Sequence, residues 1–191
     1  YPENQDILIA PGLSFIYDPL TIQTGHGFQT IEAVDTDGDN VDEIVKVNFG
    51  DLIEDNTMLQ ITIYHIQSDK TISHNSFTVP VKGVVSCEDE TYSPMSRLYY
   101  FGDFMGTGKA QMLTISHNKA FTGNDMTSYF ALIDLATKSK ISETKLFSVG
   151  FDDAGNILPL DMDGDGKLEL CRMNTEGMEV YRFSDRQFIK S

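Results

Sequence analysis

The chain has 191 residues, 40% of them hydrophobic, and carries a formal net charge of −15. This apolar content supports a packed core and excludes a disordered chain, and no apolar run approaches the ~18 residues of a membrane-spanning helix. The acidity also excludes DNA and RNA as partners, because binding to their phosphates needs a basic surface. We therefore expect a globular protein that neither inserts into a membrane nor binds nucleic acid.

Short runs rich in Val, Ile, Tyr, Phe and Thr follow one another along the chain, separated by clusters of Gly, Asn, Asp and Ser. Helical periodicity is nearly absent, and this pattern predicts an all-β fold. We expect residues 1–24 to supply the last strands of a preceding unit. The later predicted strands are, in chain order, Phe28–Val34, Glu43–Phe49, Met58–Ile66, Ser76–Val81, Arg97–Phe101, Gln111–Ser116, Ser128–Leu135, Lys145–Val149, Leu168–Met173 and Met178–Phe183.

Three segments of the chain, 28–47, 98–115 and 157–173, align on one pattern of strand, tight loop and strand. Their loops begin at Asp35, Asp103 and Asp161, and each segment has room for two more strands after it. Units of about four strands are typical of β-propeller blades. The sequence thus predicts one domain over residues 1–191, with blades at 25–95 (including an acidic insertion at 84–94), 96–150 and 151–191.

About three blades fit in this length, whereas closed propellers have roughly four to eight. We therefore expect either a fragment of a larger propeller or an open arrangement whose edges are covered in another way.

Two of the three loops concentrate carboxylates: residues 35–43 carry five acids and no base, and residues 161–169 carry four acids and one Lys. Acids this close repel one another unless a cation lies among them, and calcium takes six to eight oxygen ligands from such loops. We predict two calcium ions, each held by the side chains of loop positions 1, 3, 5 and 9 and the backbone carbonyl of position 7. These residues are Asp35, Asp37, Asp39, Val41 and Glu43 in the first loop and Asp161, Asp163, Asp165, Lys167 and Glu169 in the third.

An EF-hand loop begins in the same way, but it requires a bidentate Glu at position 12 and a helix on either side. Position 12 is Lys46 in the first loop and Arg172 in the third, and the flanking residues have the pattern of strands. The sequence therefore excludes EF-hands.

The second loop keeps Asp103 at position 1, but Met105, Thr107 and Gln111 replace the later acids. One carboxylate does not hold calcium usefully. We expect this loop to keep the same shape without metal, through hydrogen bonds and packing.

The pattern resembles the FG-GAP or VCBS-type repeat. It consists of a strand, an Asp-x-Asp-Gly-Asp loop that ends in Glu, and a second strand, and it recurs about every sixty residues. The resemblance covers most of residues 25–183 and is carried by the first and third loops, while Phe101-Gly-Asp103-Phe keeps only the frame. Such repeats form propeller blades in integrin α-chain heads and in secreted or surface bacterial proteins, including Rhs-like and toxin-complex proteins. The resemblance implies calcium at the loop between the first two strands of a blade, and no catalysis.

The function expected from this resemblance is a non-enzymatic, calcium-stabilised scaffold on or outside a bacterial cell, as a monomer or as part of a larger chain. It would recognise a protein or a carbohydrate. Two alternatives stay open, namely a glycan-active lyase or hydrolase and a shell segment of an Rhs or toxin-complex protein.

No histidine pair has the spacing of a metal-binding helix, so no catalytic residue is predicted, and we expect His65 to pack within its strand. Two cysteines do not make a disulfide framework, so both are expected to be free. The histidines and cysteines are His26, His65, His74, His117, Cys87 and Cys171.

Overall fold

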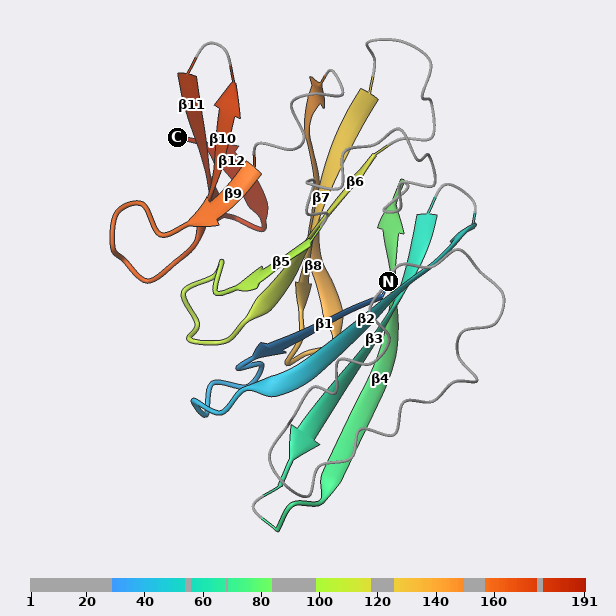
Figure 1. The fold of residues 1–191 in the computed structure, drawn as a ribbon. Coiled ribbons are helices and arrows are strands. Elements are labelled where there is room, and N and C mark those ends of the chain that lie inside the picture. Colours follow the sequence, from blue (N-terminus) through green and yellow to red (C-terminus); the bar gives the residue numbers. More distant parts are fainter. Residues whose placement is uncertain are drawn as a thin grey trace, which may run out of the picture.

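The computed structural model describes residues 29–53, 56–67, 69–83, 99–117, 126–149, 157–174 and 177–191. Within these ranges the fold is all-β, as predicted, and consists of three four-stranded antiparallel sheets (Figure 1). A search of the same ranges found no helix long and apolar enough to cross a membrane. Residues 1–24, the insertion at 84–94, His26 and Cys87 lie outside the described residues.

Each sheet is a meander in which every strand pairs with the next strand along the chain. The first sheet contains β1 (Gln29–Val34), β2 (Glu43–Ile53), β3 (Asn56–Ile66) and β4 (Ile72–Lys82). The second contains β5 (Tyr99–Gly102), β6 (Gln111–His117), β7 (Met126–Asp134) and β8 (Ser139–Val149). The third contains β9 (Ile157–Leu160), β10 (Glu169–Asn174), β11 (Gly177–Ser184) and β12 (Gln187–Lys190).

Strand β12 is the element that the residue pattern did not predict. It pairs with β11 across a two-residue turn, in which Asp185 and Arg186 both have positive φ, at 49° and 63°. Two such residues in succession are typical of the tight hairpin turn that suits strand twist, where Asn-Gly or Asp-Gly is usual. The pair Asp-Arg lacks that signature, so the hairpin was not visible in the sequence.

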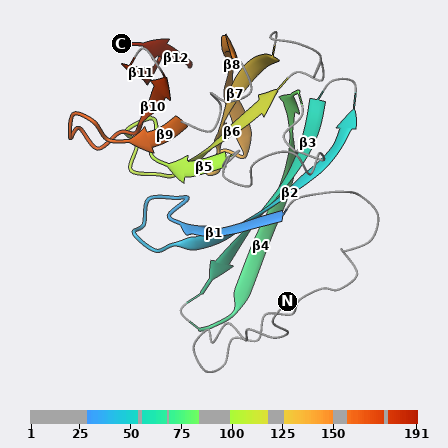
Figure 2. The ribbon, with the colours of Figure 1, turned by 45° about the horizontal axis from the view of Figure 1, so that its top comes forward.

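The second sheet lies between the other two and packs against both (Figures 1 and 2). Neighbouring residues of a strand point to opposite faces, so Met112 joins the core against the first sheet and Leu113 joins the core against the third. The first core contains Val45, Val47, Leu59, Ile61, Ile63, Val79 and Val81 of the first sheet with Met112, Ala131 and Ile133 of the second. The other contains Leu113, Ile115, Phe130 and Leu132 of the second sheet with Ile157, Leu170, Tyr181 and Phe188 of the third.

The same backbone hydrogen bond joins each pair of neighbouring sheets. The amide of Ala110 donates to the carbonyl of Asp35 at 2.8 Å, and the amide of Leu168 donates to the carbonyl of Asp103 at 2.9 Å. In both cases position 8 of one loop contacts position 1 of the preceding loop. At these loops, the second sheet therefore contacts the first in the same way as the third sheet contacts the second.

The outer face of the third sheet, which points away from the second, exposes several apolar side chains. Their shared side follows from the strand register, which places Cys171 beside Leu158 and Val180, and Met173 beside Met178. The exposed apolar residues of this face are Leu158, Leu160, Met173, Met178 and Ile189.

Candidate metal-binding loops

The three loops that join the first two strands of each sheet share one backbone conformation. Loop position 4 has a positive φ in all three, at 86° for Gly38, 69° for Gly106 and 76° for Gly164. Position 6 does too, and here the first loop uses Asn40, at 65°, where the others have glycine. Glycine enters this region without steric cost, and Asn does so more readily than other side chains. The alignment made on the sequence is therefore an alignment of local structure.

The aspartate at position 1 accepts a hydrogen bond from the backbone amide of position 6 in all three loops, and in the first and third loops it also accepts one from position 4. Asp35 accepts from Gly38 at 2.6 Å and from Asn40 at 2.9 Å. Asp161 accepts from Gly164 at 2.7 Å and from Gly166 at 3.0 Å. These bonds favour the ionised carboxylate, and the Gly38 amide is the largest cause that lowers the pKa of Asp35.

Position 9 closes each loop from the start of the second strand. Glu43 accepts a hydrogen bond from the amide of Thr36, and Glu169 accepts one from the amide of Met162, both at 2.8 Å. Both glutamates are buried, at 5% and 3% exposure. A buried carboxylate needs a compensating charge or further hydrogen bonds, so the surroundings of these two residues decide what each loop is able to bind.

The structure brings most of the predicted ligand side chains together. Asp35, Asp37 and Asp39 place one carboxylate oxygen each within 4.8 Å of one another in the first loop. In the third loop Asp161, Asp163 and Glu169 meet the same limit. Position 9 of the first loop, Glu43, falls in a second group that shares Asp37 and includes His65.

Three other predicted ligands make contacts within their own loops. Asp165 accepts from the amide of Lys167 at 2.9 Å and lies 3.4 Å from its ammonium nitrogen. The amide of Lys167 is the largest cause that lowers the pKa of Asp165. Val41 is 56% exposed, and its amide donates to Asp39 at 2.8 Å.

The second loop has the hydrogen bonds that the sequence led us to expect, and Gln111 makes most of them. Its side-chain oxygen accepts from the amides of Phe104 and Met105 at 2.8 and 3.1 Å. Its side-chain nitrogen donates to the hydroxyl of Thr107 at 3.2 Å and to the carbonyl of Lys109 at 2.6 Å. Those two acceptors stand at positions 5 and 7, so an amide here satisfies the oxygens that a cation would contact in the acidic loops.

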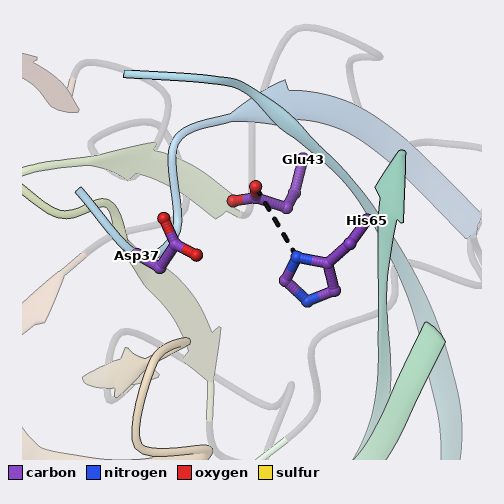
Figure 3. A group of neighbouring side chains, drawn as sticks. All are labelled: Asp37, Glu43 and His65. Atoms are coloured by element: carbon purple, nitrogen blue, oxygen red, sulfur yellow. Dashed lines mark ion pairs between the residues drawn. The ribbon is translucent and has the colours of Figure 1, made fainter. Parts of the chain in front are cut away.

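Two residues on the third strands, neither of them predicted as a ligand from the sequence, reach the acidic loops. Arg182 of β11 lies 2.7 Å from an oxygen of Asp163 and 3.4 Å from an oxygen of Glu169. His65 of β3 lies 3.6 Å from an oxygen of Glu43 (Figure 3). In the strand register, position 10 of each loop pairs with a tyrosine of the third strand: Ile44 pairs with Tyr64, and Leu170 pairs with Tyr181. His65 and Arg182 are the residues that follow these tyrosines. Counting register along the repeat would have found them.

The donor set of both acidic loops fits a hard divalent cation. It consists of carboxylate oxygens, each able to accept more than the one or two amide bonds it already has, and calcium prefers such oxygens. Glycine or Asn at the turn positions lets the chain fold closely around a central point. The loops differ in charge, because the third contains its own Lys167 and the guanidinium of Arg182, whereas residues 35–43 include no Arg or Lys.

Comparison with protein-family models, with curated proteins and with solved structures found no match to this chain.

Proposed function

We propose that the chain is a calcium-stabilised, non-enzymatic scaffold of the FG-GAP or VCBS type, whose three sheets are successive propeller blades. The observation that carries this proposal is the loop frame common to all three sheets, acid-lined in the first and third. Calcium bound there would tie the first two strands of a blade together, because its ligands come from the loop and from the start of the second strand. The ion's role would be structural.

The blade assignment is supported by the repeated contact between neighbouring sheets. In both observed contacts the backbone carbonyl of position 1 accepts a hydrogen bond from the amide of position 8 in the next loop. The carbonyl of Asp161 and the outer apolar face of the third sheet would suit one more sheet of the same kind. That is the arrangement of a propeller with further blades. We therefore propose that these sheets form part of a larger propeller.

The proposed task of the scaffold is recognition of a protein or carbohydrate partner outside the cell or at its surface. Support for this location comes from the calcium loops, since millimolar calcium outside cells fills sites of modest affinity. The acidic chain, at −15, favours a partner surface that is neutral or basic.

The test of the calcium proposal is binding stoichiometry, measured by titration calorimetry on chelator-stripped protein. We expect two ions for the unmodified chain, one for Asp37→Ala or Asp163→Ala, and two for Asp103→Ala, which changes position 1 of the loop that lacks the acid cluster. We also expect the third loop to bind more weakly, because calcium there competes with Arg182 for Asp163 and Glu169. Two ions retained in Asp37→Ala, or none in the unmodified chain, would contradict the proposal.

A further inference from the structure

The residue on the third strand next to position 9 differs in each sheet. It is His65 in the first, Asp134 in the second and Arg182 in the third. Asp134 pairs directly with Gln111 in the strand register, whereas His65 and Arg182 lie within 4 Å of the position-9 glutamate. The same place in the fold therefore carries an imidazole, a carboxylate and a guanidinium, of which the imidazole is the one that offers a nitrogen ligand to a metal.

In the second and third loops, side chains of the protein already donate hydrogen bonds to, or form ion pairs with, the oxygen atoms that a cation would contact. In the second, the amide of Gln111 donates to positions 5 and 7. In the third, Arg182 pairs with both Asp163 and Glu169. The first loop has five acids within nine residues, and His65 is the group that faces Glu43 from the third strand.

Glu43 supplies a second, independent observation, because its side chain is only 6% exposed. One of its oxygens accepts from the amide and hydroxyl of Thr36, at 2.8 and 2.6 Å. Its other oxygen receives no hydrogen bond from the described residues and is directed toward His65 and Asp37 (Figure 3). This oxygen faces Nδ1 of His65 at 3.6 Å, and a metal ion between these side chains would compensate the charge of the buried carboxylate.

We propose that Asp37, Glu43 and His65 form a three-ligand site for a borderline divalent metal of the zinc class. This rests on the proposed function only in placing a cation at the first loop, and it goes further by adding a nitrogen ligand. Two carboxylates and one imidazole suit zinc better than calcium, which prefers oxygen alone.

The distances allow this assignment. The three ligand atoms lie within 4.8 Å of one another, and tetrahedral zinc, with bonds of about 2.0–2.2 Å, needs them about 3.3 Å apart. Asp37 is exposed and the side chain of His65 is 29% exposed, so both have room to close on the buried Glu43. The remaining coordination position is open to water.

The experiment is a calorimetric titration of untagged, chelator-stripped protein with Zn²⁺ alone, and separately with Ca²⁺ alone. We expect one zinc site with a dissociation constant near or below about 10 µM, weakened at least tenfold in His65→Gln. The exposed loop variant Asp37→Asn should weaken zinc comparably while leaving the fold intact by circular dichroism. His74→Gln is the matched control and should leave zinc affinity unchanged; the His74 ring lies tilted against that of Tyr64, with the ring centroids 5.7 Å apart.

The two proposals fail separately. Zinc binding that is absent, or that His65→Gln and His74→Gln weaken equally, would overturn the zinc site whatever calcium does. Calcium binding that is absent while zinc binds through His65 would overturn the calcium proposal and leave the zinc site standing. Calcium affinity in His65→Gln should stay within about twofold of the unmodified chain, because imidazole is not a calcium ligand.

Discussion

Replacing Gln111 with Ala should destabilise the protein by about 2 kcal/mol, because the change removes the group that organises the second loop. Gln111 is 1% exposed and accepts from the buried amide of Phe104 at 2.8 Å. A buried donor left without an acceptor costs about 1–3 kcal/mol, and the carbonyl of Lys109 loses its donor as well. With a urea slope of about 2 kcal/mol per M, the unfolding midpoint should fall by about 1 M.

The assay is urea unfolding followed by circular dichroism, with calcium and with chelator. We expect the same loss in both conditions, because the Gln111 amide stands in for a cation in this loop. The matched control is Gln60→Ala on the neighbouring sheet, where an exposed Gln accepts from Asn48 at 3.2 Å and the change should stay within about 0.5 kcal/mol. A midpoint shift no larger than that of Gln60→Ala, or one that appears only in calcium, would refute the reasoning.

Two further predictions concern packing between sheets and acid stability. A Cβ at Gly102 would lie 2.2 Å from a methyl carbon of Leu168, so Gly102→Val should cost about 1–3 kcal/mol by overpacking. Adding Leu168→Ala should recover part of that cost, and a double-mutant cycle that shows strictly additive losses would contradict the contact. The hydrogen bond from Lys190 lowers the pKa of Glu179 below its usual 4.5. The ionised carboxylate therefore stabilises the fold fully at pH values above its unfolded-state pKa. This contribution is lost as the pH falls through the lower, folded-state pKa. Unfolding free energies measured between about pH 2 and 6 should therefore fall less steeply in Glu179→Gln, and an unchanged acid slope would count against the ion pair.

Much of this fold was visible in the residue pattern, because the strands are rich in Val, Ile, Tyr, Phe and Thr and are bounded by turn residues. The repeat was the strongest signal, since it aligns Asp35, Asp103 and Asp161 at the first position of their loops. The structure bears this out in the backbone angles and in the hydrogen bond that each of these aspartates accepts from the amide of position 6. The missed strand β12 follows a turn of Asp185 and Arg186 whose conformation owes nothing to Gly or Asn.

Only those residues of the candidate sites that lie within the loops themselves were predicted from the sequence. Each loop supplies its own carboxylates, so their clustering follows from spacing alone. His65 and Arg182 come from strands more than ten residues downstream, and their contacts depend on register and on the face that each side chain takes. We expected His65 to pack within its strand, and it lies in β3 with its side chain beside Glu43 of the neighbouring strand.

The most direct test of the central claim is a thermal melt of chelator-stripped protein with and without saturating calcium. A ligand that binds only the folded state stabilises it by about 2.7 kcal/mol at one hundred times its dissociation constant. In a domain of this size that corresponds to about 5–10 °C per site. A midpoint raised by calcium, and raised less in Asp37→Ala and in Asp163→Ala, is the predicted result, while the same midpoint in calcium and in chelator would contradict a calcium-stabilised scaffold.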